Sequence, residues 1–395
     1  MKTSDFDKNL AIRPWKPKID MVPHLTIETN MTCNFRCKSC YNKNRSRVKT
    51  LEEIKREIDL GLSMRKADTI TLLGGEPSIH PELPEIISYV KSKGVVTQML
   101  TNGFVFLSDP DDTLLKQLKQ NGLDRVLLHI DEGQEEYENP MESIHRFLKK
   151  TEKLDILTTL SWTIYKGGEG RIPDLIREFS VYPNFDGFLS TLERSFDEMV
   201  QHRVINSEGP HLKNEYDSLL QSLSLQPSVY LPSSLEGHSI SWLVYLYYVN
   251  SVTQRTFYLS PALTRLYQNL YLRTKKQELF GIPPVHRFFN LTLMAAGILD
   301  CLINPGRTGS FLKLLQQSKG MSLLRYQYLA IQDGPRYHAE NGSFSICYHC
   351  PDATIRNGKL SPVCLADRIS PNPGDTPPAG VALDIQAIVY EHLNQ

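Results

Sequence analysis

The chain has 395 residues, and its 44 Lys and Arg residues balance its 44 Asp and Glu residues. This balance disfavours a nucleic-acid substrate, because no overall basic field attracts a polyanion. The N-terminus has no apolar signal segment, and the longest apolar run, Trp242–Val249, is too short to cross a bilayer. Seven cysteines without a secretory signal indicate reduced thiols. We expect a cytoplasmic protein without a transmembrane segment, for which contact with a membrane surface stays open.

After an N-terminal extension over residues 1–24, residues 25–195 alternate short β-rich runs with polar helical stretches. This alternation is typical of βα units around a parallel sheet. Six units fall short of an eightfold barrel, so we expect an α/β fold with a partial (β/α)6 barrel. The expected strands are Leu25–Thr29, Thr69–Leu73, Val95–Thr101, Arg125–Ile130, Ile156–Thr163 and Gly187–Ser190. The expected helices are Leu51–Met64, Pro81–Lys93, Asp112–Asn121, Pro140–Lys153 and Pro173–Phe179.

Residues 196–340 are expected to form a helical insertion without clear strands, a possible substrate lid. Ser260-Pro261 predicts a helix start, and a second apolar stretch covers 288–303. Aromatic residues recur here, either as helix–helix core or as the lining of a channel for an apolar chain: Trp242, Tyr245, Tyr247, Tyr248, Phe257, Tyr267 and Tyr271. The nearby cations Arg273, Lys275 and Lys276 would suit an anionic head group.

Residues 341–395 return to β structure and are expected to end in a helix near Val381–Leu393. Asn357-Gly358 lies between two extended arms, a strong signal for a β-hairpin. This hairpin would bring Cys347 and Cys350 close to Cys364. The segment is therefore predicted to be a small cluster-binding hairpin.

Three cysteines, Cys33, Cys37 and Cys40, follow the first expected strand at a C-x3-C-x2-C spacing. Three thiolates can hold three corners of an iron–sulfur cube and leave one iron free for a chelating ligand. A structural zinc site is the alternative, but it needs four closed ligands that this spacing does not supply. Other unusual residues also follow strands, and ligand sites of α/β sheets lie at that edge.

Together with Gly74-Gly75-Glu76-Pro77, the cysteine motif resembles the radical S-adenosylmethionine (SAM) superfamily. The resemblance implies a [4Fe–4S] cluster on Cys33, Cys37 and Cys40, with SAM chelated at its open iron. It also implies that Gly74, Gly75, Glu76 and Pro77 form the turn that binds the amino group of SAM.

Three further residues are expected near SAM on the same resemblance. The residue before the third cysteine is commonly aromatic in the family but is Ser39 here, and Tyr41 would substitute for it. Asn102 matches the turn near the ribose and methionine, although a plain turn is equally compatible. Asp131 would contact the cofactor or the substrate and is the candidate catalytic residue.

The remaining cysteines are Cys301, Cys347, Cys350 and Cys364. Four thiolates satisfy a second, auxiliary [4Fe–4S] cluster, and the C-terminal segment resembles the Twitch or SPASM segments of this superfamily. If Cys301 belongs to a helix core, three ligands remain and one iron is open, or His349 completes the set. A zinc site on the same residues is the alternative.

The resemblance implies an enzyme that reductively cleaves SAM to a 5′-deoxyadenosyl radical, which abstracts hydrogen from an unactivated carbon. The first expectation for the substrate is a long-chain, lipid-like molecule. A peptide- or protein-modifying maturase is the alternative, and a non-catalytic zinc- or cluster-binding protein is a second one. The implied partners are a reductant protein, such as flavodoxin or ferredoxin, and a small-molecule, lipid or peptide substrate.

Overall fold

The computed structural model describes residues 1–2, 14–38, 40–42, 45–194, 209–233, 239–275, 289–316, 324–338 and 343–369. The expected closing helix near Val381–Leu393 lies outside these residues. Among the described helices, none has the length and apolar character needed to cross a membrane.

Six parallel strands stand in sequence order, as predicted, and form one side of a larger sheet. They are β1 (His24–Asn30), β2 (Thr69–Gly74), β3 (Val96–Thr101), β4 (Arg125–His129), β5 (Leu157–Ile164) and β6 (Phe185–Leu192). The sheet does not close on itself, because β1 and β7 remain at its two ends. The expectation of a partial (β/α)6 barrel is confirmed.

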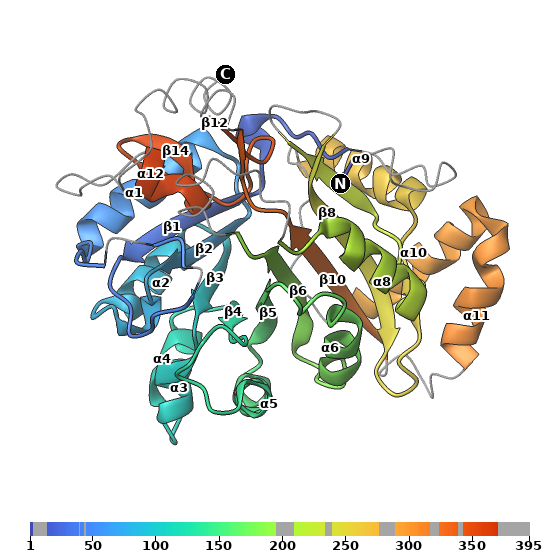
Figure 1. Ribbon diagram of the computed structural model, residues 1–395, viewed down its shortest axis with the longest axis horizontal. Coiled ribbons are helices and arrows are strands. Elements are labelled where there is room, and N and C mark those ends of the chain that lie inside the picture. Colours follow the sequence, from blue (N-terminus) through green and yellow to red (C-terminus); the bar gives the residue numbers. More distant parts are fainter. Residues whose placement is uncertain are drawn as a thin grey trace.

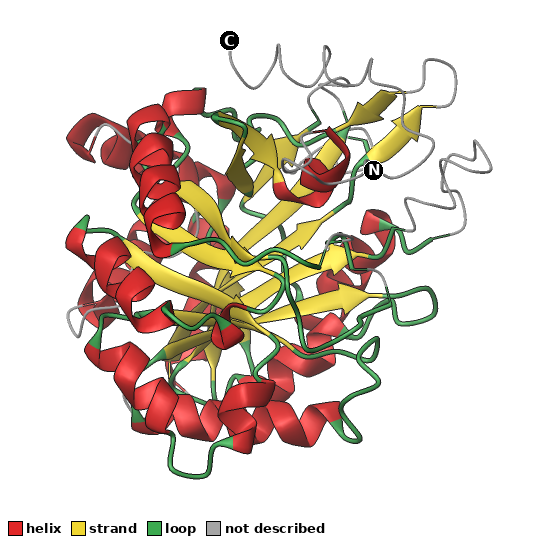
Figure 2. Cartoon of the chain, turned by 90° about the vertical axis from the view of Figure 1, so that its left-hand side faces the viewer, coloured by secondary structure: helices red, strands yellow, loops and turns green. Residues whose placement is uncertain are grey.

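Helices between these strands cover the outer face of the sheet (Figure 2). They are α1 (Leu51–Met64), α2 (Leu83–Ser92), α3 (Phe104–Ser108), α4 (Thr113–Gln120), α5 (Pro140–Lys153) and α6 (Ile172–Phe179). The helix α1 begins at a capping box, in which Thr50 and Glu53 satisfy each other's backbone N–H groups. Its buried face, with Ile54 and Ile58, packs in the main hydrophobic core. Short 3-10 helices lie at Ile19–Met21, Pro77–Ile79, Pro305–Arg307 and Val363–Leu365.

The segment 196–340 differs from the expectation of helices without strands. Its described part contains α8 (Leu212–Leu223), α9 (Pro261–Lys275), α10 (Phe289–Ile303) and α11 (Thr308–Gln316). It also contains β7 (Val229–Pro232), β8 (Ile240–Asn250), β9 (Thr256–Tyr258) and β10 (Leu324–Gln332). Strand β10 runs parallel to β6, and β8 runs antiparallel to β10, so the sheet continues through this segment.

The missed strand β8 coincides with the apolar run Trp242–Val249. Every residue of β8 is buried, and a strand buried on both faces loses the alternation that identifies strands in sequence. Two of its aromatic residues, Tyr245 and Tyr247, belong to the main core, whereas Tyr248 packs with Phe257 in a second core beneath α11. The boundaries of the insertion and its role as a lid stay predictions.

Two small hairpins follow the sheet. The first joins β11 (Arg336–His338) to β12 (Ser343–Ser345), and the second joins β13 (Ala353–Arg356) to β14 (Lys359–Pro362), followed by α12 (Ala366–Ile369). The second is the predicted hairpin at Asn357-Gly358, where both residues have positive φ angles of 50° and 74°. Such angles are what a two-residue hairpin turn requires.

This C-terminal segment contacts both ends of the open sheet. Tyr348 N donates to Pro232 O of β7 over 3.0 Å, and Cys347 forms an antiparallel β-bridge with Ser233. At the other end, β13 packs against β1 and α1. Figure 1 shows β14 and α12 beside α1 and β1. The segment thus bridges the gap that keeps the barrel partial.

Candidate functional site

A cavity of about 330 Å³ runs along the parallel strands to their carboxyl ends and reaches the C-terminal segment. It is lined by eleven of the predicted site residues, of which ten are the following: Cys33, Cys37, Cys40, Tyr41, Gly74, Gly75, Glu76, Cys347, Cys350 and Cys364. The eleventh is Asn102. The structure therefore brings two cysteine groups, more than three hundred residues apart in sequence, to one cavity.

The first cysteine group sits in the loop after β1. Phe35 N donates to Cys33 Sγ over 3.4 Å, and Gln134 Nε2 donates to Cys37 Sγ over 3.7 Å. Burial raises the pKa of Cys33, and burial raises the pKa of Cys37 to about 12, with the charge on Cys40 adding to both. These thiols are close enough to oppose each other's ionisation. A bound metal cation would instead lower their pKa values, because it stabilises the thiolate form.

The Gly-Gly-Glu-Pro turn packs directly on this loop. Gly75 N donates to Asn30 O over 2.7 Å, and Glu76 N donates to Thr32 O over 2.9 Å. Gly74 has a φ of +133°, and a Cβ atom on Gly74 or Gly75 would overlap these carbonyl oxygens. Both glycines are therefore required by the close approach of two backbones.

The Glu76 carboxylate is buried and holds the turn after β3. It accepts from Thr101 Oγ1 over 2.5 Å, from Asn102 N over 2.7 Å and from Ser78 N over 3.0 Å. Burial raises its pKa despite these bonds. Pro77 is buried, starts a short 3-10 helix and does not line the cavity. Glu76 thus links the second and third strand ends.

Asn102 and Tyr41 both line the cavity. Asn102 Nδ2 donates to Asn34 Oδ1 over 2.8 Å, which ties the β3 turn to the cysteine loop. The Tyr41 hydroxyl is buried and has no hydrogen-bond partner among the described residues. It is therefore free to bond a ligand.

Asp131 differs from its expected role. It is buried, does not line the cavity, and accepts from Gly133 N over 2.8 Å and Thr163 N over 3.2 Å. Its neighbours His129 and Tyr165 line the cavity instead, with His129 Nε2 3.6 Å from Asp131 Oδ2. A buried carboxylate with backbone donors is a positioning group, so direct contact between Asp131 and a ligand is not supported.

The second cysteine group lies in the C-terminal segment. Trp242 Nε1 donates to Cys347 Sγ over 3.0 Å. The pKa of Cys350 is raised by a hydrogen bond with Cys347 and by burial, and the pKa of Cys364 is raised by burial and by Cys350. Cys350 is therefore a neighbour of both Cys347 and Cys364.

Cys301 and His349 do not join them. Cys301 lies on α10, packs against the second core and is not part of the cavity lining. His349 Nδ1 lies 2.8 Å from Pro17 O, and the residue does not line the cavity. A cysteine in an apolar helix packs as a small hydrophobe, which accounts for the position of Cys301.

Residues 27–163 match the family model described as the radical SAM superfamily. The match contains the cysteine loop and the Gly-Gly-Glu-Pro turn whose contacts are given above. The chain carries a radical SAM domain.

A probable GTP 3′,8-cyclase of Pyrococcus horikoshii is 30% identical over 168 residues, which cover 40% of this chain and 52% of the relative. A GTP 3′,8-cyclase of Chlorobaculum tepidum is 31% identical over 150 residues, or 36% of this chain and 43% of the relative. The chain thus spans about half the length of the curated relatives it matches. Streptococcus suis SuiB bound to its precursor peptide SuiA has a TM-score of 0.40 and 16% identity, covering 54% of this chain and 48% of SuiB.

The radical SAM domain offers a donor set that fits the cofactors of its family. Three thiols of one loop face the cavity beside a glycine turn, which suits a cluster with one open iron and a ligand above it. Among the described residues, no three His, Cys, Asp or Glu side chains already stand in metal-ligating geometry. The fit therefore rests on three observations: the donors are cysteines, they belong to one loop, and they line the same cavity.

A row of polar residues across the radical SAM domain was not singled out from the sequence. Thr26, Thr71, Gln98 and Arg125 are register partners on β1 to β4, and all four line the cavity. Gln98 Nε2 donates to Thr71 Oγ1 over 2.9 Å, and Arg125 pairs with buried Asp186 over 2.8 Å. Their alternation with apolar residues along each strand was the available signal.

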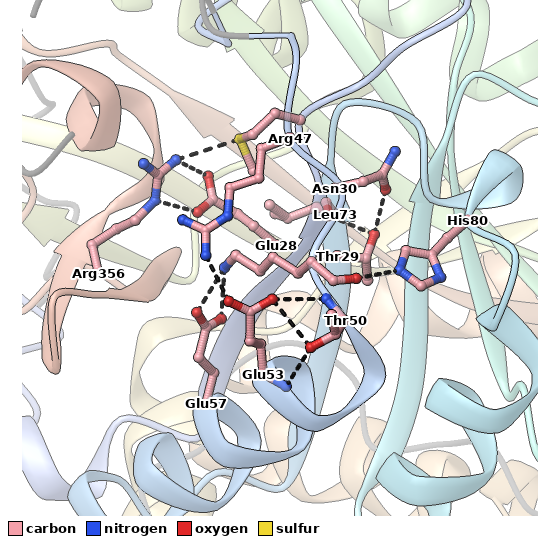
Figure 3. A network of polar contacts seen from close by, with 12 residues as sticks. Glu28, Thr29, Asn30, Arg47, Thr50, Glu53, Glu57, Leu73, His80 and Arg356 are labelled. Carbon is pink, nitrogen blue, oxygen red and sulfur yellow. Dashed lines mark hydrogen bonds and ion pairs between the residues drawn. The ribbon is translucent and has the colours of Figure 1, made fainter. Parts of the chain in front are cut away.

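A buried ion-pair network joins the radical SAM domain to the second cysteine segment (Figure 3). Arg356 of β13 binds both Glu28 oxygens, at 2.5 and 2.7 Å, and Asp367 at 3.0 Å. Nearby, Lys49 binds Glu57 at 2.7 Å and Arg47 binds Glu53 at 2.8 Å. The contact between Arg356 and Glu28 fixes the C-terminal hairpin on β1, next to the cysteine loop.

Proposed function

We propose that this chain is an enzyme that reductively cleaves SAM and uses the 5′-deoxyadenosyl radical to abstract hydrogen from a substrate carbon. The observation that carries the proposal is the single cavity shared by the Cys33–Cys40 loop and the Gly74–Glu76 turn, inside the matched domain. A bound [4Fe–4S] cluster supplies the electron for the cleavage, and a protein such as flavodoxin or ferredoxin replenishes it.

The chain's own residues would hold and orient these groups. Cys33, Cys37 and Cys40 would ligate the cluster, and Gln134 would hydrogen-bond the Cys37 sulfur. The glycine turn lets a ligand approach the backbone closely, and Asn102 and the unpartnered Tyr41 hydroxyl offer polar contacts.

The second cysteine group supports an auxiliary cluster. Cys347, Cys350 and Cys364 all line the cavity, with Cys350 next to the other two, whereas Cys301 and His349 do not line it. We therefore assign three protein ligands to this cluster, whose remaining iron position would face the cavity.

The cavity wall supports a substrate that carries hydrogen-bonding groups. Of the seven aromatic residues expected to form an apolar channel, only Trp242 lines the cavity. The wall instead contains Gln98, Arg125 and Thr26, whose buried hydroxyl has no partner among the described residues. A wholly apolar chain would leave the Thr26 hydroxyl without a partner, at a cost of roughly 1–3 kcal/mol. A polar or amphiphilic substrate therefore fits better than an apolar one.

Metal analysis after anaerobic reconstitution tests the cofactor assignment. Two clusters predict about eight irons per chain, and Cys364→Ala should lower this to about four. Cys301→Ala is the matched control and should keep about eight, because a core cysteine holds no iron. Zinc without iron in the reconstituted chain would overturn the enzyme proposal, and loss of iron in Cys301→Ala would overturn the three-ligand assignment.

The reaction itself is tested by release of 5′-deoxyadenosine under dithionite. The reconstituted chain should form it, and Cys37→Ala should not. Pools of polar metabolites, peptides and lipid extracts are then compared for stimulation of release. Stimulation by polar or amphiphilic molecules supports the substrate class, whereas stimulation by hydrocarbon chains alone contradicts it.

A further inference from the structure

Helices α9, α10 and α11 expose apolar side chains on their outer faces. Leu302 is 73% exposed, Leu270 57% and Ile298 50%. On α10 the exposed positions follow an i, i+1, i+4, i+5 spacing, and on α9 an i, i+1, i+4 spacing, so each helix presents one stripe. The docking face is defined by these residues: Leu266, Tyr267, Leu270, Ile298, Leu299, Leu302, Ile303 and Leu312.

The same helices already bury another face against the sheet. Leu263 of α9 and Phe311 and Leu314 of α11 are buried in the second core, with Phe257 5.1 Å from Phe311 between ring centroids. The exposed stripes are therefore not needed for the core. Apolar residues on a second face of a helix indicate contact with something outside the fold.

The charge of this region differs from that of the whole chain. Residues 261–316 contain only two acidic residues, Glu278 and Asp300, and seven basic ones: Arg265, Arg273, Lys275, Lys276, Arg287, Arg307 and Lys313. Asp300 is buried and paired with Arg307, so it adds no exposed negative charge. Arg273 and Lys313 are exposed, on α9 and α11. The whole chain, by contrast, has equal numbers of acidic and basic residues.

We propose that α9, α10 and α11 dock this face on a bilayer that contains anionic lipids. Apolar stripes beside Lys and Arg on helices too short to span a membrane are typical of elements that lie in the interface. Anionic head groups would attract Arg273 and Lys313 while the leucines enter the acyl boundary. A second copy is a poorer occupant, because a symmetric contact would bring these cations against each other.

The docking face is connected to the cavity through α9. On the inner side of this helix, Tyr271 Oη donates to Asp68 Oδ2 over 3.1 Å, and Asp68 lines the cavity. Docking would therefore place the bilayer one helix away from the cavity wall. Figure 1 shows α9, α10 and α11 on one side of the molecule, opposite α1 and α12.

Vesicle flotation of the full chain, purified anaerobically, tests the proposal. The protein should float with vesicles of phosphatidylcholine containing about one third phosphatidylglycerol, and binding should weaken with added salt. The double variant Leu270→Glu, Leu302→Glu should lower the partition coefficient by about tenfold or more. Arg273→Gln with Lys313→Gln, which leaves the apolar stripes intact, should lower it about threefold or more at low salt.

Val181→Glu is the matched control, because Val181 is 50% exposed but lies outside the docking face. It should bind vesicles as the wild type does. Circular dichroism and thermal unfolding establish that each variant is folded. Absence of flotation, equal flotation of Leu270→Glu, Leu302→Glu and wild type, or a dimer that dissociates in this variant without vesicle binding would each overturn the proposal. The readout does not depend on SAM cleavage.

Discussion

The indole N–H of Trp242 donates a hydrogen bond to Cys347 Sγ over 3.0 Å. Trp242 belongs to β8, in the extension of the sheet, and Cys347 begins the second cysteine group. This bond thus joins the sheet directly to a sulfur that we assign to the auxiliary cluster. Hydrogen bonds to ligand sulfurs stabilise the added negative charge of a reduced cluster.

Trp242→Phe should therefore lower the reduction potential of the auxiliary cluster by roughly tens of millivolts, without loss of iron. A redox titration followed by electron paramagnetic resonance measures the change. Trp162→Phe is the control, since Trp162 is equally buried on β5 but does not line the cavity. An unchanged potential in Trp242→Phe would show that the bond does not act on a cluster.

Glu76→Gln should destabilise the fold by about 1–3 kcal/mol. The carboxylate of Glu76 accepts three hydrogen bonds, and in glutamine an NH₂ group that cannot accept takes the place of one of its two oxygens. The donors are Thr101 Oγ1, Asn102 N and Ser78 N. Urea unfolding of the protein measures the free-energy difference. Glu85→Gln on the exposed face of α2 should stay within about 0.5 kcal/mol of wild type. Equal stability of the two variants would contradict the role given to Glu76.

Arg356→Met should cost about 3–5 kcal/mol, because it leaves the buried Glu28 and Asp367 carboxylates without their shared cation. Denaturant unfolding and protease susceptibility of the C-terminal hairpin report the effect. Neutralising all three positions with Glu28→Gln, Arg356→Met and Asp367→Asn should recover part of the loss. A single variant as stable as wild type would exclude this network as the anchor of the hairpin.

The sequence was sufficient for the six parallel strands because each alternates with a helix and ends at a recognisable turn. It also predicted the hairpin at Asn357-Gly358, just before Cys364 in the chain. It was insufficient for β8, which is buried on both faces and lacks alternation. Continuous apolar runs do not distinguish a buried strand from a helix.

The other differences between the predicted and the observed site arise from contacts between residues far apart in the sequence. The sequence does not show that backbone donors already occupy Asp131, or that Cys301 lies on α10 outside the cavity lining. These depend on how β5 and α10 fold back onto their neighbours. The polar row from Thr26 to Arg125 depends on strand register, which spacing along one strand does not determine.

Glu215 on α8 makes the stability of the fold depend on pH. It is fully buried, accepts from Gly170 N over 2.8 Å, and burial raises its pKa from 4.5 to about 7. The folded chain therefore holds a proton that the unfolded chain releases between these values. The contribution of Glu215 to stability is therefore greatest below pH 4.5 and falls as pH rises toward 7, by up to about 3 kcal/mol.

Glu215→Gln imitates the protonated side chain and keeps the oxygen that accepts from Gly170. The variant should match wild type near the acid end of the range and exceed its stability above pH 7 by about 2–3 kcal/mol. Urea unfolding at a series of pH values measures the divergence. Exposed Glu138→Gln should follow the wild-type curve throughout. If the curves for Glu215→Gln and wild type stayed parallel across the whole range, ionisation of this buried carboxyl would not be coupled to unfolding, and its burial would have to be relieved by a neighbouring rearrangement.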